Sequence, residues 1–366
     1  MFEPSRLVLA RRRRGWKRSE LARRTGLKAR TITAYELGER APSDESLEEL
    51  ARALGFPPGF FTRSQVEMIQ ADGVSFRALT KMSATQRDRA LAAGEMALEL
   101  AEWVGTEFEL PEPHVPDLRL EKSPGAAAMA LRTAWGLSDR PIGNLIRLLE
   151  SKGIRVFSLD EKDRSLDGFS FWRGGEPFIF LNMQKSAERS RFDAAHELGH
   201  LVLHRHGGAA GLDTEREAMA FASAFLMPKS SILAHAPRSP TLPSLMEAKK
   251  WWGVSLAALI RRLYDLGRIS RHYYRGLYIQ LAKLGYRENE PEPMARELSH
   301  VWPLVFQGMR EEGKRRSDIA KLLDWPLQEL KALVFQMTIS GEEGGQRIAS
   351  LKAPPPNPRQ TIRLVQ

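Results

Sequence analysis

The feature that most constrains this 366-residue chain is the pair of histidines at 196 and 200, separated by Glu197, Leu198 and Gly199. Residues four apart on an α-helix lie about 6 Å apart along its axis and about 40° apart around it, so both imidazoles reach one metal ion. Glu197 points about 100° away, where it is placed to accept a proton and not to bind the ion. The pattern therefore predicts a helix that carries part of a metal site.

Histidines further along the chain fit the same ion poorly. The chain has no cysteine, so every remaining ligand must be His, Asp or Glu. His204 lies about 12 Å beyond His196 along a continuous helix, so we interpret it as a supporting or structural residue. His206 has the spacing of a third metzincin histidine, but Leu203 stands where a glycine is needed to bend the chain.

The next predicted helix, over about 213–227, is a better source of the third ligand. Its small residues, including Ala218 and Ala222, would let it lie close to the histidine helix. Glu215 and Glu217 both qualify by position. They lie about 200° apart around the helix, so only one of them faces the ion.

The N-terminal segment has the layout of a helix-turn-helix. Short helices are predicted across residues 5–61, with one over 19–25, a tight turn at Gly26 and a second over 28–36. Residues 1–40 hold twelve Lys/Arg and four Asp/Glu, so they supply +8 of the formal net charge of +10. This concentration of positive charge favours a polyanion as partner, because neutralising phosphates releases counterions.

With residues 36–43 and 50–55, this segment resembles the XRE/Cro/C1-type repressor domain over about 5–61. The resemblance implies binding to a double-stranded DNA operator, commonly as a homodimer on a palindrome. The residues that it places against the major groove are Arg18, Ala29, Arg30, Thr33 and Ala34. The residues predicted to contact phosphates, which position a protein without reading sequence, are Lys17, Lys28 and Arg40. A helical protein-interaction domain of the same fold is the alternative.

The remaining pattern predicts a multidomain, mainly α-helical chain with one small β-sheet. Strands are expected at about 154–158, 168–172 and 178–182. Further helices are expected at about 83–105, 124–135, 140–152, 186–205, 241–252 and 255–266, with more over 270–340. We divide the chain into a helix-turn-helix domain (1–62), a connector (63–122), a metal-site domain (123–270), a helical C-terminal region (271–340) and a disordered tail (341–366). Residues 317–333 look like a second helix-turn-helix but lack the turn glycine, so a plain helical pair is preferred.

Residues 189–204 followed by 215–228 resemble the ImmA/IrrE family of metallopeptidases, and the resemblance extends over about 140–270. It implies an α+β zincin-like domain with Zn²⁺ held by His196, His200 and Glu215, and with Glu197 as the general base. Met219 departs from the family, which usually has Asn or Asp at that position. Histidine–carboxylate sites also accept manganese or iron. No oxyanion donor is assigned; the candidates are His206, His235 and Tyr264.

Two functions follow from these features. In the first, the chain regulates transcription and hydrolyses a repressor, often one of XRE type, or cleaves itself, in a stress or mobile-element response. In the second, it is a non-proteolytic repressor or antitoxin-like regulator that uses the metallopeptidase fold as a metal or ligand sensor. No apolar run of bilayer-spanning length and no signal peptide are recognised, so we expect a cytoplasmic protein without a membrane partner.

Overall fold

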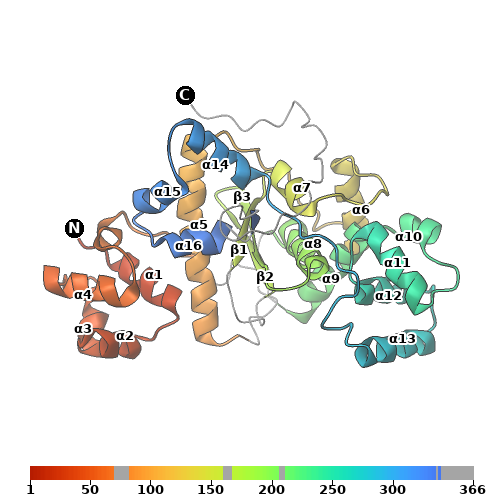
Figure 1. The fold of residues 1–366 in the computed structure, drawn as a ribbon, viewed down its shortest axis with the longest axis horizontal. Helices are drawn as coiled ribbons and strands as arrows, with labels where there is room; N and C mark the ends of the chain where they lie inside the picture. Colours follow the sequence, from red (N-terminus) through yellow and green to blue (C-terminus); the bar gives the residue numbers. More distant parts are fainter. Residues whose placement is uncertain (70–81, 160–166, 206–210, 335–336, 339–366) are drawn as a thin grey trace, which may run out of the picture.

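A three-stranded sheet lies at the centre of the molecule (Figure 1). The computed structural model describes residues 1–69, 82–159, 167–205, 211–334 and 337–338. The strands are β1 (Arg155–Leu159), β2 (Gly168–Arg173) and β3 (Glu176–Asn182). Their order is β1-β3-β2, with β1 parallel and β2 antiparallel to β3. Helices surround this sheet, which confirms the predicted mainly helical fold with one small sheet.

Alternating side chains divide the sheet into two faces that belong to different hydrophobic clusters. One face is a layer of phenylalanines: Phe157, Phe169, Phe171, Phe178 and Phe180. The rings of Phe169 and Phe180 stack with centroids 4.4 Å apart. The other face carries Val156, Ile179 and Leu181 and packs with the helices of the predicted metal-site domain. The sheet thus lies between the other helices of that domain and the helices that pack on the phenylalanine face.

The two helices on the aliphatic face are α8 (Ala187–Leu203) and α9 (Leu212–Leu226), and they pack closely. A Cβ atom at Gly199 of α8 would lie 3.0 Å from the Phe221 ring and 3.2 Å from the Cα of Ala218 on α9. Glycine on one helix therefore meets alanine on the other, as the small residues in the sequence predicted. This contact determines how closely residues of α9 approach the two histidines.

The N-terminal domain consists of four helices and a short 3₁₀ helix. They are α1 (Pro4–Arg14), α2 (Arg18–Thr25), α3 (Ala29–Glu36), α4 (Asp44–Leu54) and η1 (Pro58–Thr62). Gly26 ends α2 with φ of +69°, a left-handed conformation that favours glycine and permits the tight turn. Fully buried Leu21 and Ile32 hold α2 against α3. This geometry is that of a helix-turn-helix.

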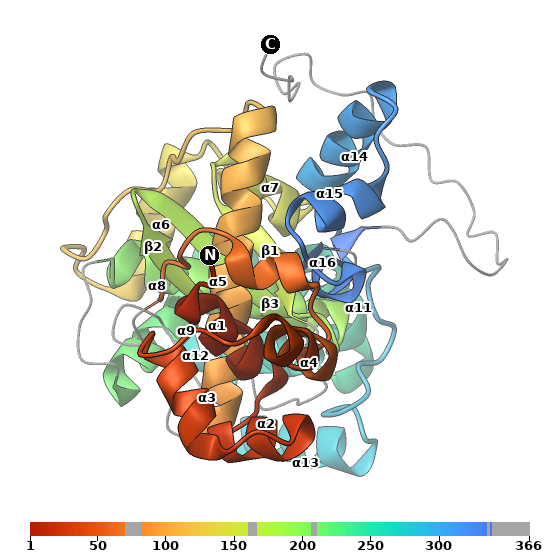
Figure 2. The same cartoon turned by 90° about the vertical axis from the view of Figure 1, so that its left-hand side faces the viewer.

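The N-terminal helices share a hydrophobic cluster with the phenylalanine side of the sheet. The long helix α5 (Ala84–Glu107) stands between them (Figures 1 and 2). Buried Arg12 pairs with buried Glu95 of α5, at 3.0 Å. Glu329 of α16 (Leu327–Val334) pairs with Arg13 at 2.6 Å and with Arg14 at 2.5 Å. Elements from both ends of the chain therefore meet on α1.

The remaining helices lie around this framework. They are α6 (Pro124–Ala134), α7 (Leu145–Ser151), α10 (Lys229–His235), α11 (Leu242–Trp252), α12 (Leu256–Asp265), α13 (Arg271–Lys283), α14 (Val301–Glu311) and α15 (Arg316–Leu322). The sequence did not predict α10. The start predicted for α7 at residue 140 was wrong, because the Asn144 side chain caps the helix by accepting from the Arg147 amide.

Helical structure over all of 270–340 was also wrong. Residues 287–300 contain no α-helix and return from α13 towards α14 across α8. Two buried ion pairs bind this segment to the rest of the domain: Arg191–Glu297, and Lys249–Glu290 at 3.1 Å. Lys249 also pairs with Glu188 of α8 at 3.1 Å. The predicted disorder of 341–366 lies outside the described residues. No helix in the described part of the chain is both long and apolar enough to cross a membrane.

Candidate metal centre and DNA-reading helix

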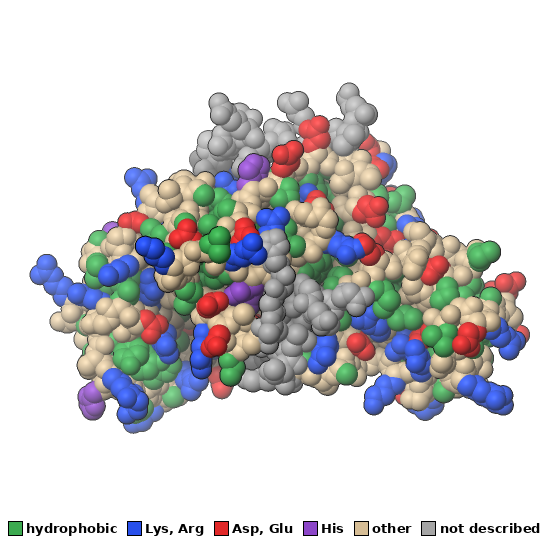
Figure 3. Space-filling view, turned by 180° about the vertical axis from the view of Figure 1, so that it is seen from behind, with side chains coloured by type: hydrophobic (Ala, Val, Ile, Leu, Met, Phe, Trp, Pro, Cys, Tyr) green, Lys and Arg blue, Asp and Glu red, His purple; other side chains and the backbone are tan. Residues whose placement is uncertain are grey.

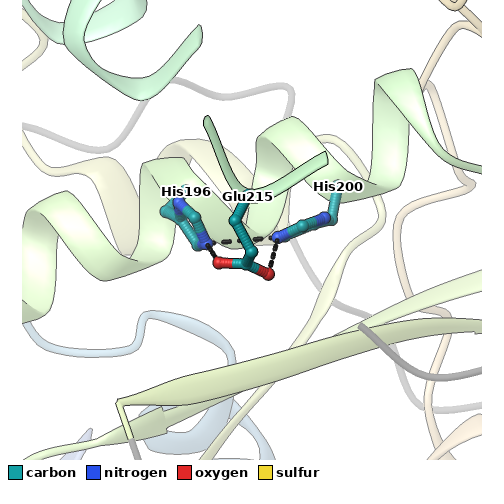
Figure 4. A group of neighbouring side chains, drawn as sticks. All are labelled: His196, His200 and Glu215. Atoms are coloured by element: carbon teal, nitrogen blue, oxygen red, sulfur yellow. Dashed lines mark hydrogen bonds and ion pairs between the residues drawn. The ribbon is translucent and has the colours of Figure 1, made fainter. Parts of the chain in front are cut away.

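Two histidines of α8 and one glutamate of α9 converge on one point (Figure 4). The Nε2 atoms of His196 and His200 lie 3.1 Å apart. The two carboxylate oxygens of Glu215 each lie 3.3 Å from one of these nitrogens. His196 and His200 are buried, whereas the Glu215 side chain is 22% exposed. The three predicted ligands are therefore brought together by two closely packed helices.

The spacing of this trio suits a small divalent ion. Ligands at about 2.0–2.1 Å from a tetrahedral ion lie about 3.3 Å from one another. The observed separations of 3.1 and 3.3 Å match that value. Two imidazoles and one carboxylate also form a ligand set that leaves one position for water or substrate. The residues present therefore fit a catalytic type of zinc site.

Electrostatics support Glu215 as a charged partner of the histidines. Burial raises the pKa of its carboxyl, but hydrogen bonds with His196 and His200 outweigh burial and lower the pKa to about 2. Glu217 points elsewhere, with a side chain 52% exposed, and its carboxylate lies 3.0 Å from Nε2 of His204. The structure thus separates the two glutamates that the helical pattern alone left as alternatives.

The carboxylate of Glu197 lies against the sheet. The Ser170 hydroxyl of β2 donates to Oε2 of Glu197 at 2.8 Å and to its backbone carbonyl at 3.2 Å. Both residues are 1% exposed. Gly168, at the start of β2, is required by the neighbouring strand, because a Cβ there would lie 2.6 Å from the carbonyl oxygen of Phe180 on β3. The same Cβ position lies 3.5 Å from Cγ of Glu197, so this end of β2 is next to the glutamate. Ser170 was not predicted, since its role depends on the position of a strand distant in sequence.

The other polar candidates contact residues other than the Glu215 carboxylate. His204 ends α8, and its Nδ1 lies 3.1 Å from Nδ1 of His200, consistent with a supporting role. His235 stacks on Trp251, and Tyr264 stacks on Tyr274. Met219 is 41% exposed on α9, and His206 lies outside the described residues.

The basic residues of the N-terminal domain fall into two groups. Eight of the twelve Lys/Arg in residues 1–40 form ion pairs: Arg6, Arg11, Arg12, Arg13, Arg14, Arg18, Arg23 and Arg24. The four others have no ion pair among the described residues and are exposed: Lys17, Lys28, Arg30 and Arg40. The four uncompensated cations are all among the predicted DNA contacts.

The predicted reading helix is α3, and it presents its N-terminal end to solvent. Lys28, Ala29 and Arg30 are exposed there. Thr33 is half-buried and donates its hydroxyl to the Ala29 carbonyl at 3.1 Å, and Ala34 is half-buried beside it. Exposure of the first turn is what a helix needs in order to enter the major groove with its N-terminal residues.

A buried glutamate orients α3. The Glu36 side chain, 1% exposed, accepts from Arg11 of α1 and from Arg18 of α2, with both distances 2.5 Å. One carboxylate thus ties three helices together. Arg18, which was predicted to face the major groove, is therefore held by Glu36, although its side chain remains 46% exposed. Sequence reasoning missed Glu36, because nothing local distinguishes it from a solvated helical glutamate.

Comparison with known families finds two matching domain models. A helix-turn-helix model matches residues 7–61. A model described as the IrrE N-terminal-like domain matches residues 149–264. No curated protein matches the chain in sequence. The first match supports DNA-binding regulation, and the second supports a metallopeptidase-like fold around the His196–His200–Glu215 trio. The chain is thus a fusion of a helix-turn-helix domain with an IrrE N-terminal-like domain.

Proposed function

We propose that this chain is a transcription regulator with a zinc-dependent endopeptidase domain. Its substrate would be a repressor-type protein, with an XRE-type repressor or the chain itself as the first candidates, cleaved in a stress or mobile-element response. The observation that carries this proposal is the buried Glu197, which follows His196 on α8, together with a trio that has the spacing of a catalytic zinc site. We place the protein in the cytoplasm, where an operator is accessible.

The chemistry would divide among few side chains. His196, His200 and Glu215 would hold the ion, which supplies Lewis acidity that polarises a carbonyl and acidifies a water. Glu197 accepts a proton from the attacking water and returns it to the leaving amine. Ser170 keeps that carboxylate in one orientation through its 2.8 Å hydrogen bond. Burial of Glu197 limits competing contacts with bulk water.

Proteolysis is tested with the isosteric variant Glu197→Gln, which removes the base and leaves the three ligands. Purified wild type and variant are incubated with XRE-type repressors, and all chains, including the enzyme, are measured by mass spectrometry. We expect site-specific cleavage by the wild type only, with equal zinc content in both proteins. Equal cleavage by both proteins would remove Glu197 from the mechanism. No cleavage by the zinc-loaded wild type would favour the second function below.

The DNA-binding half of the proposal rests on charge placement around α3. Lys17, Lys28 and Arg40 are free to contact phosphates, and Arg30 has the geometry to pair with guanine O6 and N7. Two copies of α3 in a homodimer would read a palindrome, with half-sites about one helical turn apart. Arg30→Ala should weaken operator binding by about 1–3 kcal/mol and relax the preference at one base pair. Unchanged operator affinity and selectivity of Arg30→Ala, measured by fluorescence anisotropy, would contradict the assignment of Arg30 as a base contact.

A second candidate function is a regulator that senses metal without proteolysis. The observation in its favour is the connection between the two halves, since α1 shares ion pairs with α16, and α16 is bonded to the sheet through Ser158 and Ala332, at 2.7 Å. In that case metal removal would change operator affinity, and Glu197→Gln would leave the response intact. In the peptidase, by contrast, Glu197→Gln abolishes substrate loss in the presence of the ion.

A further inference from the structure

Helix α13 forms a strongly basic surface outside both segments matched by the family models. Residues 266–287 contain five Lys/Arg and no Asp or Glu. These five residues are all exposed: Arg268, Arg271, Arg275, Lys283 and Arg287. None of them has an ion pair within the described parts of the chain, whereas most arginines of α1 and α2 are paired. The charge on this surface, which we call the α13 surface, is therefore uncompensated.

The positions of these cations on α13 do not stabilise the helix itself. Leu277 and Leu281 are the buried residues of α13 and pack into the domain core. Arg271 and Arg275 are exposed, one turn apart, and lie about 120° around the helix from this buried pair. Both are in the N-terminal half of the helix, whose first turn contains no acidic residue. Cations near a helix N-terminus interact unfavourably with the positive end of the helix dipole. Their clustering there therefore favours binding of an external anion.

The α13 surface lies on the same side of the molecule as the reading helix. In Figure 1, α2 and α3 are at one end of the lower edge and α13 is at the other end. In Figure 2, which views the molecule from its left-hand side, α2, α3 and α13 again lie together at the lower edge. Seen from behind, Lys and Arg side chains project at both lower corners (Figure 3). The two views agree that α3 and α13 are aligned along the long axis of the molecule.

We propose that the α13 surface is a second contact for DNA, binding the phosphate backbone of the same duplex that α3 reads. The proposal rests on the DNA-binding function proposed above and extends it to the peptidase-like half of the chain. Exposed, unpaired arginines are suited to phosphate oxygens, and their alignment with α3 suits a rod-shaped polyanion better than a compact one. Phosphate contacts of this kind add affinity and orientation without sequence preference.

The test compares two double variants of the full-length protein on two duplexes. Arg271→Gln with Arg275→Gln removes two charges from the α13 surface. Arg310→Gln with Lys321→Gln removes two exposed charges from α14 and α15, at the opposite edge of the molecule. One duplex spans about one helical turn, enough for α3 alone, and the other spans about four turns. Binding is measured by fluorescence anisotropy across a range of salt concentrations, with circular dichroism confirming that each variant is folded.

We expect wild type to bind the long duplex more tightly than the short one. The α13 double variant should lose on the order of tenfold in affinity for the long duplex, and the slope of log K against log salt should fall by about 2. Its binding to the short duplex should match wild type, and the control variant should match wild type on both. Equal binding of the α13 variant and the control to the long duplex would overturn the inference. An equal loss on both duplexes would also overturn it. Absence of any DNA binding by wild type would instead refute the proposed function.

Discussion

Gly199 is the residue at which helix packing and the metal centre depend most directly on each other. A Cβ placed on it would meet Phe221 Cδ1 at 3.0 Å, Ala218 Cα at 3.2 Å and Ala218 O at 3.3 Å. Ordinary contacts of this kind begin at 3.4 Å. Two of the three atoms belong to the backbone of α9, so Gly199→Ala requires α9 to move by a few tenths of an ångström. That movement carries Glu215, three residues before Ala218, away from the two histidines.

Two opposing effects determine how much Gly199→Ala changes the free energy of unfolding. Alanine stabilises a helix interior by about 0.5–1 kcal/mol relative to glycine, whereas overpacking costs about 1–3 kcal/mol. Gly105→Ala is the matched control, because Gly105 is also helical and a Cβ there would have no described atom within 4 Å. Gly199→Ala should therefore have a free energy of unfolding about 1–3 kcal/mol below that of Gly105→Ala.

Urea unfolding followed by circular dichroism measures this difference in the metal-free proteins. Competition with a chromophoric chelator then measures zinc affinity, which we expect to fall for Gly199→Ala and to stay at the wild-type value for Gly105→Ala. Equal stabilisation of both variants would refute the packing argument. A destabilised Gly199→Ala with unchanged zinc affinity would show that Glu215 does not depend on the α8–α9 distance.

Three further predictions concern buried polar groups. Glu329→Gln removes the charged carboxylate that pairs with Arg13 and Arg14, so the free energy of unfolding in urea should fall by about 3 kcal/mol. An unchanged value would mean that these ion pairs do not join the domains. Ser170→Ala removes the hydrogen bond that orients the Glu197 carboxylate, so kcat of peptide hydrolysis should fall about tenfold while the zinc content stays unchanged. Loss of zinc would instead show that Ser170 stabilises the metal site. Because the pKa of Glu215 is lowered to about 2, its ionised form stabilises the metal-free fold above pH 4.5, and this contribution is lost as the pH falls towards 2. The difference in free energy of unfolding between wild type and Glu215→Gln should therefore become smaller across that pH range. A constant difference would contradict the lowered pKa.

The parts of the metal centre that could be predicted are those determined by helix geometry. His196 and His200 are four residues apart, and any helix brings such a pair to one side. Helical angles also showed that only one of Glu215 and Glu217 faces the ion. The choice of Glu215 required a resemblance to a known family, because the rotation of α9 about its own axis depends on packing against α8.

What could not be predicted depends on partners far along the chain. The basic run of α1 looked like a nucleic-acid patch, yet Arg12 and Arg13 pair with glutamates 83 and 316 residues further on. Such pairs are decided by the tertiary arrangement of α1, α5 and α16. Local rules also failed where a side chain caps a helix, as Asn144 does for α7. The charge count was therefore correct, but most of that charge stabilises the fold, and a smaller exposed remainder faces solvent near α3.

Zinc content by elemental analysis tests the central claim most directly. We would compare purified wild type with His196→Ala, Glu215→Gln and Glu217→Gln, the last being the matched control on the same helix. We predict about one zinc per chain for wild type and Glu217→Gln, and loss of the ion from His196→Ala and Glu215→Gln. No zinc in the wild type after supplementation, or loss from Glu217→Gln with retention by Glu215→Gln, would contradict the site described above.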